Sequence, residues 1–68
     1  MLIRIRLKEV LHDRGMTQKE LSIKADMREA TVSAIARNKQ DLVNLRHLEK
    51  IAAALEVTPL ELFEVEEE

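Results

Sequence analysis

The sequence predicts an all-α fold, a compact five-helix domain that spans residues 1–68. Apolar residues recur at helical spacing along most of the chain, and capping or stop signals separate these runs. A chain of 68 residues also has room for one domain only. Both chain ends depart from the helical pattern. We therefore also expect a short two-stranded β-ribbon formed by residues 2–5 and 63–66.

Two helices are expected in the first part of the chain. The first covers residues 6–14 and is followed by Gly15 as a stop signal. Its apolar stripe has the spacing i, i+3, i+4 and consists of Leu7, Val10 and Leu11. The second begins at a capping box, in which the Thr17 hydroxyl and the Glu20 carboxylate each accept from the other residue's backbone amide. It runs to about Ala25.

The third helix is expected over residues 29–37, after a break in the pattern at residues 26–28. Val32 and Ile35 have the spacing of an inward-facing pair. Asn38 follows the last turn and suits the left-handed backbone conformation that often ends a helix.

The fourth helix has the strongest amphipathic pattern in the chain. Asn44 is placed as its cap. Its apolar positions are Leu45, Leu48, Ile51, Ala52 and Leu55. A short fifth helix follows, with Thr58 as the cap, Pro59 at the first helical position and Glu61 as the capping-box carboxylate. It ends near Phe63.

The two chain ends carry opposite charges. The N-terminal stretch LIRIRL alternates apolar and basic residues, and the C-terminal stretch EVEEE is acidic. Paired as strands, they would place Glu64 or Glu66 opposite Arg4 or Arg6, a contact worth about 0.2–1 kcal/mol per pair. In the alternative interpretation, the two arginines belong to the first helix and residues 66–68 form a disordered tail.

The net charge of −2 conceals an asymmetry along the chain. Residues 1–55 carry eleven Lys and Arg against seven Asp and Glu, whereas residues 56–68 carry six Glu and no base. The body of the protein is therefore mildly basic and its tail acidic, so binding partners must be judged from the local balance. With one Phe and neither Trp nor Tyr, the chain is poorly suited to bind single-stranded nucleic acid by base stacking.

The spacing of the second and third helices indicates a helix-turn-helix. A helix of about eight residues is followed by a turn of about three residues and a second helix, and small residues such as Ser22 and Ala25 permit the close crossing. In this motif the second helix lies in the major groove of DNA.

Over this stretch, TQKELSIKADMREATVSAIARNK, the sequence resembles the phage-repressor/Cro-type (XRE) helix-turn-helix family. The matching positions are Thr17, Gln18, Leu21, Thr31, Val32, Ser33, Ile35, Arg37 and Lys39. LEKIAAALEVTPLELF is similar to the family's fourth and fifth helices, so the resemblance covers residues 5–63 and implies a lambda-repressor-like domain. Asp26 and Asn38 stand where the family usually has Gly, and Leu11 and Ala36 stand where many members have an Arg–Glu pair.

By this resemblance, the chain binds double-stranded DNA. The implied DNA-contacting residues are Thr17, Gln18, Arg28, Glu29, Ala30, Ser33, Ala34, Arg37 and Lys39. Short side chains in the middle of the third helix would let its backbone approach the base edges, and the basic residues at its ends would contact phosphates. In the alternative interpretation, Ala30 and Ala34 are simply good helix formers, and Arg37 and Lys39 stabilise the helix C-terminus.

The resemblance also implies a symmetric homodimer on a two-half-site operator. Its expected interface consists of Leu60, Leu62, Phe63 and Val65. The alternative function is a protein-interaction module, such as an antitoxin or adaptor on the same scaffold, for which an outward-facing Ile23 would be a contact.

No enzyme activity, cofactor or metal site is expected. The chain has no cysteine, and His12 and His47 lie on different predicted helices without a second ligand at helical spacing. It also contains no apolar run long enough to cross a membrane and no signal-peptide layout at its N-terminus. We therefore expect a cytoplasmic protein that is nucleoid-associated when it binds DNA.

Overall fold

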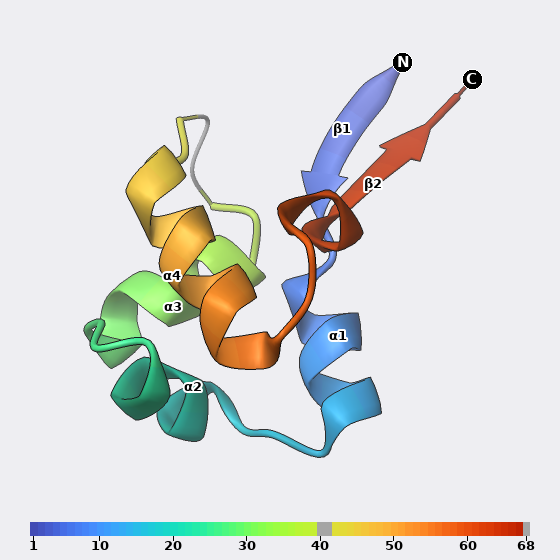
Figure 1. Cartoon of the computed structure of the whole chain (residues 1–68). Coiled ribbons are helices and arrows are strands. Elements are labelled where there is room, and N and C mark those ends of the chain that lie inside the picture. The colour runs from blue at the N-terminus through green and yellow to red at the C-terminus, as the bar shows by residue number, and fades with distance from the viewer. Residues whose placement is uncertain (40–41, 68) are drawn as a thin grey trace.

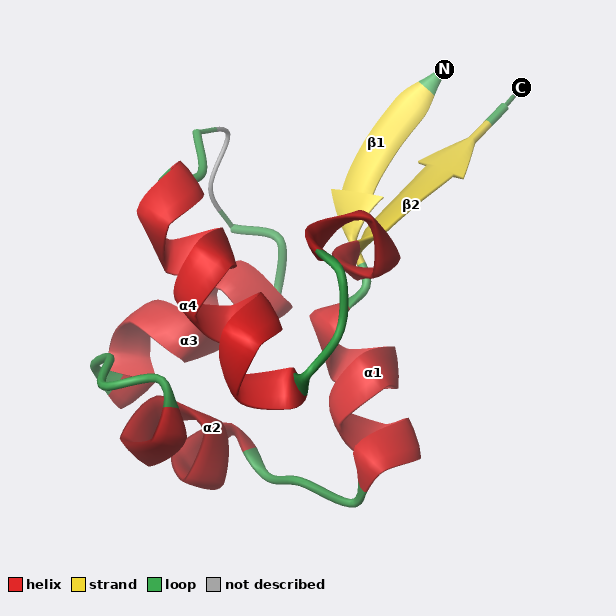
Figure 2. Cartoon of the chain, in the orientation of Figure 1, coloured by secondary structure: helices red, strands yellow, loops and turns green. Residues whose placement is uncertain are grey.

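The helix-turn-helix elements and a small ribbon formed by the chain ends are all present in the computed structural model, which describes residues 1–39 and 42–67 (Figures 1 and 2). The elements follow in the order β1 (Leu2–Ile5), α1 (Leu7–Arg14), α2 (Gln18–Lys24), α3 (Glu29–Ala36), α4 (Leu45–Leu55), the 3₁₀ helix η1 (Pro59–Leu62) and β2 (Phe63–Glu66). No helix within these residues is both long and apolar enough to span a membrane.

The local signals that bound the helices act as the sequence predicts. Thr17 Oγ1 accepts from the Glu20 N–H at 3.0 Å, and the Glu20 carboxylate accepts from the Thr17 N–H at 3.2 Å. Asn44 Oδ1 caps α4 by accepting from the Arg46 N–H at 2.8 Å. Asn38 has φ 55°, the left-handed conformation expected after α3. The boundaries of α1 to α4 therefore fall within one or two residues of the predicted ones.

The predicted fifth helix is a single 3₁₀ turn, so the described residues contain four α-helices rather than five. The Glu61 N–H donates to the Thr58 carbonyl at 3.0 Å, the i+3 to i bond of a 3₁₀ helix. The Glu61 carboxylate accepts from the Thr58 N–H at 2.7 Å. Because β2 begins at Phe63, only four residues lie between the Thr58 cap and the strand, and an α-helix has no room to propagate.

The expected ribbon is an antiparallel pair of β1 and β2, with Ile3 opposite Val65 and Arg4 opposite Glu64. The Arg4 guanidinium forms ion pairs with Glu64 at 3.4 Å and with Glu66 at 3.1 Å. These side chains are partly exposed, so each pair contributes about 0–1 kcal/mol. The predicted complementarity of the two ends is confirmed for Arg4.

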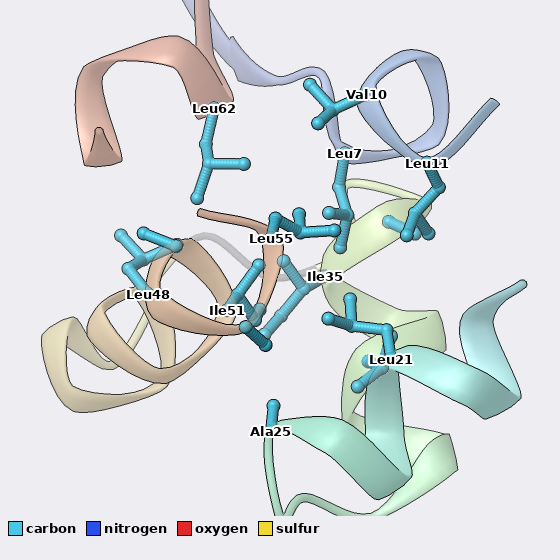
Figure 3. Packing of buried hydrophobic residues seen from close by; sticks show 14 of the residues in the cluster. Leu7, Val10, Leu11, Leu21, Ala25, Ile35, Leu48, Ile51, Leu55 and Leu62 are labelled. Carbon is cyan, nitrogen blue, oxygen red and sulfur yellow. The ribbon is translucent and has the colours of Figure 1, made fainter. Parts of the chain in front are cut away.

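The core is formed where all four α-helices and η1 meet (Figure 3). Its fully buried members are Leu7, Leu21, Val32, Ile35, Ile51 and Leu62. Leu11 and Ala36 are also buried, so an apolar contact region replaces the charged pair of many family members and no unpaired charge is buried there.

Leu62→Ala is expected to lower the free energy of unfolding by about 2–5 kcal/mol, because it removes a fully buried side chain and leaves a cavity. The matched control is Leu60→Ala in the same 3₁₀ turn, where the side chain is 81% exposed and the expected change is within about 0.5 kcal/mol. Urea unfolding of both variants measures the difference. Equal destabilisation would contradict the placement of these two leucines.

Candidate nucleic-acid interface

The turn between α2 and α3 is built from local hydrogen bonds. The Ala25 N–H donates to the Leu21 carbonyl at 2.8 Å, and the Met27 N–H donates to the Ser22 carbonyl at 2.9 Å. Asp26 takes the left-handed conformation, with φ 55°, at the position where the family usually has Gly. Ser22 and Ala25 are buried, as expected for small residues in a close helix crossing. The helix-turn-helix geometry is therefore present.

The residues of α3 itself place only short side chains and one carboxylate on its outer face. Glu29 and Ala30 are exposed, and Ser33 and Ala34 are half-buried, whereas the inner face packs into the core. A helix with so little side-chain bulk on its outer face can approach a groove surface closely with its backbone.

The side chain of Arg37 points toward the N-terminal end of α3 and reaches Ser33, one turn earlier. We did not predict this contact from the sequence. The Arg37 Nε and one terminal nitrogen donate to Ser33 Oγ at 3.1 and 2.8 Å. The Ser33 hydroxyl oxygen thus already accepts two hydrogen bonds, and it supports the Arg37 guanidinium beside the outer face of α3. The i, i+4 spacing of Ser33 and Arg37 is the signal from which this contact could have been expected.

The ends of α3 carry positive charge that no acidic group neutralises within the described residues. Arg28 and Lys39 are exposed at the two ends, and neither these two residues nor Arg37 forms an ion pair there. The other two predicted contact residues lie at the start of α2. Thr17 is exposed but its hydroxyl is engaged in the capping box, and Gln18 is half-buried.

The predicted dimer residues do not form one exposed group. Leu62 is fully buried in the core of its own chain, so it is not available to a partner, and this part of the prediction is wrong. Phe63 is half-buried against the same core. Leu60 and Val65 are exposed, and Ile3, opposite Val65 on the ribbon, is 63% exposed. The alternation in LIRIRL was the signal that could have added Ile3 to the prediction.

The ribbon that carries Ile3 and Val65 lies away from α2. Both chain termini and the ribbon project together from one end of the molecule, and α2 lies at the other (Figure 1). Ile23 on α2 is 73% exposed, as the alternative function predicted. Exposed apolar residues are therefore present both on the ribbon and on α2.

Comparison with known proteins agrees with this geometry. Residues 6–68 match the family model described as the Cro/C1-type HTH DNA-binding domain. No match was found among curated proteins.

Two solved structures are similar to this chain. One is the SinR protein/SinI protein complex, with 33% identity and a TM-score of 0.77 over 84% of this chain; the match covers 55% of the other chain. The second is the N-terminal DNA binding domain of SinR from Bacillus subtilis, with 33% identity and a TM-score of 0.76, covering 84% of this chain and 83% of that one. With a family match over nearly its whole length, the chain belongs to the Cro/C1-type helix-turn-helix DNA-binding family.

Proposed function

We propose that this protein is a small transcriptional regulator that binds double-stranded DNA sequence-specifically, with residues 1–68 acting as one cytoplasmic domain. The DNA-binding assignment follows from the family. The placement of α3 in the major groove is supported by one observation above all. A face of short side chains lies between exposed Arg28 at one end and exposed Lys39 at the other, and neither cation forms an ion pair within the described residues.

The proposed contacts divide into base readout and phosphate binding. Ala30 and Ala34 lie against thymine methyl groups, and Ser33 lies beside the base edges. Glu29 accepts from cytosine N4. The phosphates on either side are held by Gln18, Arg28, Arg37 and Lys39. Thr17 shapes the start of α2 through its capping bond, which is the role that the structure gives its hydroxyl.

Arg37→Ala and Lys39→Ala are each expected to weaken binding to all duplexes about equally. Each should also reduce the magnitude of the salt slope, log K against log salt, by about 0.9, because each removes one phosphate contact. Lys8→Ala is the matched control, since Lys8 is an exposed cation on α1. Fluorescence anisotropy with a labelled random duplex at several salt concentrations gives the slopes. If all three variants keep the wild-type slope, Arg37 and Lys39 do not contact phosphates.

We further propose that the protein acts as a homodimer through an apolar end surface, defined as Ile3, Leu60 and Val65. These three side chains are 63%, 81% and 54% exposed. Ile3 and Val65 are paired on the ribbon, and Leu60 lies in η1, which directly precedes β2. This surface replaces the set expected from the sequence, because Leu62 belongs to the core and Phe63 packs partly against it. Ile3 and Val65 bring two exposed aliphatic side chains together across the ribbon, and adjoining exposed aliphatic residues are typical of an association surface.

A protein-interaction module or antitoxin is the second candidate function. The exposed Ile23 on α2 favours it, as does the similarity to a SinR chain whose structure was solved in complex with SinI. Binding to a random duplex at low salt separates the two candidates. A regulator of the proposed kind binds weakly but measurably under these conditions, whereas a pure adaptor shows no binding.

A further inference from the structure

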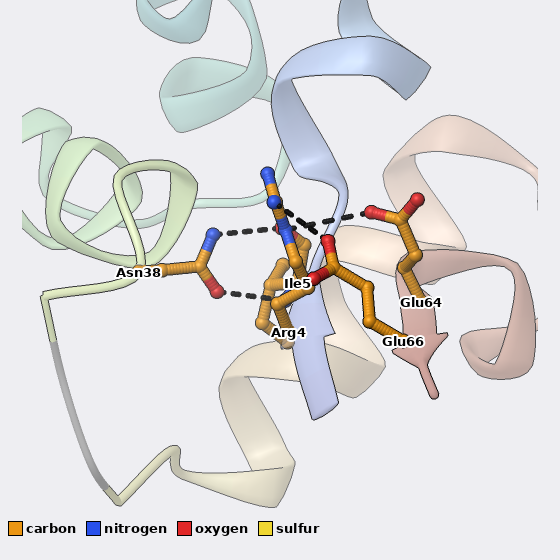
Figure 4. A network of polar contacts seen from close by, with 5 residues as sticks. All are labelled: Arg4, Ile5, Asn38, Glu64 and Glu66. Carbon is orange, nitrogen blue, oxygen red and sulfur yellow. Dashed lines mark hydrogen bonds and ion pairs between the residues drawn. The ribbon is translucent and has the colours of Figure 1, made fainter. Parts of the chain in front are cut away.

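The side chain of Asn38 joins the end of α3 to the terminal ribbon (Figure 4). Its Oδ1 accepts from the Ile5 N–H at 2.7 Å, and its Nδ2 donates to the Ile5 carbonyl at 2.8 Å. Ile5 is the last residue of β1 and lies 33 positions away in the chain. One amide therefore satisfies both backbone groups of a strand residue, as a neighbouring strand would.

The hydrogen bonding of the ribbon explains why Ile5 offers these two groups. The Arg6 N–H donates to the Leu62 carbonyl at 2.8 Å, on the side of the ribbon where the chain enters β2. Backbone groups of successive strand residues point to alternate sides. Ile5 therefore turns its N–H and carbonyl away from β2 and toward Asn38. The edge of β1 at this position is closed by a side chain from the end of α3.

The backbone around Asn38 is also fixed to α3. The Asn38 N–H donates to the Ile35 carbonyl at 3.1 Å, and the Lys39 N–H donates to the Ala34 carbonyl at 3.2 Å. Arg37 and Lys39 flank Asn38, so the backbone of both cations belongs to a segment that is held to α3 by its own hydrogen bonds and to β1 by the Asn38 amide. The Arg37 guanidinium is also held by Ser33. Helix ends fray when nothing ties them down, and α3 has only eight residues. Through the Asn38 amide, the ribbon thus helps to fix the positions of Arg37 and Lys39.

We propose that Asn38 is a positioning residue for DNA binding: by tying the end of α3 to β1, it holds Arg37 and Lys39 in place to contact phosphates. The inference rests on the proposed function, in which these two cations contact the DNA backbone. A cation held at a phosphate displaces a condensed counterion, whereas one on a loosened chain end does so less completely. The ribbon therefore supports DNA binding from outside the helix-turn-helix.

The test variant is Asn38→Gly, because glycine adopts a positive φ readily and the substitution removes the side chain that carries both hydrogen bonds to Ile5. We expect faster hydrogen exchange of the Ile5 amide, a salt slope smaller in magnitude by about 0.9, and about fivefold weaker binding to a random duplex at 0.15 M salt. The control is Ala53→Gly at an exposed position of α4. It should lower Tm by about 4–8 °C through helix propensity and leave the salt slope unchanged.

A second comparison separates positioning from direct contact with DNA. In a protein that already carries Arg37→Ala and Lys39→Ala, adding Asn38→Gly should not change the salt slope further. A further decrease would overturn the inference, because Asn38 itself would then contact DNA.

The remaining outcomes distinguish this inference from the proposed function. If Asn38→Gly keeps the wild-type slope while Arg37→Ala and Lys39→Ala reduce it, Asn38 has no positioning role and the phosphate contacts stand. If none of the three substitutions changes the slope, both the phosphate contacts and the role of Asn38 are wrong.

Discussion

Ala34→Glu is expected to weaken specific binding by at least about a hundredfold, or about 2.7 kcal/mol, while the fold is retained. Ala34 is half-buried on the outer face of α3, next to Ser33 and one turn beyond Ala30. A longer side chain there would hold the helix backbone away from the base edges. Its carboxylate would also be placed in a groove bordered by phosphates, where like charges repel.

The matched control is Ala53→Glu, which makes the same change at an exposed position of α4. Both variants replace alanine in a helix with a residue of nearly equal helix propensity, so circular dichroism and thermal unfolding should resemble the wild type. Affinity is measured on a duplex that the wild-type protein has selected from a random library. If Ala34→Glu keeps its affinity for that duplex, α3 is not the helix that reads the bases.

The parts of the fold that depend on neighbouring residues could be predicted from the sequence. The capping box of Thr17 and Glu20, the Asn44 cap and the left-handed Asn38 all depend on residues within four positions, and all are present. The ribbon was also predictable, because alternation and opposite charges marked both of its strands. Caps depend on near neighbours in the sequence, and the strands of the ribbon are indicated by the residue types within a short segment.

The errors arise where residues distant in the sequence decide the structure. Whether η1 forms a 3₁₀ turn or a longer α-helix depends on where β2 pairs with β1, and this pairing joins opposite ends of the chain. Leu62 lies in the core, whereas Leu60 and Val65 are exposed. The apolar cluster near the C-terminus gave no means to separate its buried members from its exposed ones. The partner of the Asn38 amide lies 33 residues away and could not be found from local spacing.

The candidate site shows a similar division. The family resemblance identifies the positions on α3, and the structure shows which of them are exposed. The i, i+4 spacing of Ser33 and Arg37 permits their contact, but only the structure shows that it forms. The bonds of Arg37 to Ser33 place the guanidinium on the outer face of α3 instead of beyond its end. Arg37 is therefore the residue whose proposed role gains most from the structure.

The second large expected effect is the loss of the dimer when its proposed interface is altered. A double variant, Leu60→Asp with Val65→Thr, is expected to be a folded monomer under conditions in which the wild type is a dimer. Both side chains are exposed, so neither change empties the core. Threonine keeps the β-branched shape that suits β2. Phe63 is a poorer choice for this test, because it packs against the core and its replacement would also weaken the fold.

The size of the effect follows from a narrow balance of free energies. Burial of Ile3, Leu60 and Val65 from both copies supplies on the order of 10 kcal/mol, while association costs about 4–15 kcal/mol in lost freedom. Removing two of the three apolar contacts from each copy is therefore enough to prevent dimerisation at micromolar concentration.

The consequence for DNA binding is larger than the loss of a few contacts. In a dimer, binding of one half-site presents the second recognition helix to the other half-site, about 34 Å away, at a high effective concentration. A monomer loses this advantage, so operator affinity should fall by about 10²–10⁴-fold. Sedimentation velocity at micromolar protein measures the oligomeric state, and fluorescence anisotropy on the selected operator measures the affinity. Ile23→Asp is the control, because it places a charge at an exposed apolar position elsewhere on the molecule. A wild type that stays monomeric at concentrations saturating the operator, or a double variant that remains dimeric, would exclude Ile3, Leu60 and Val65 as the dimer interface.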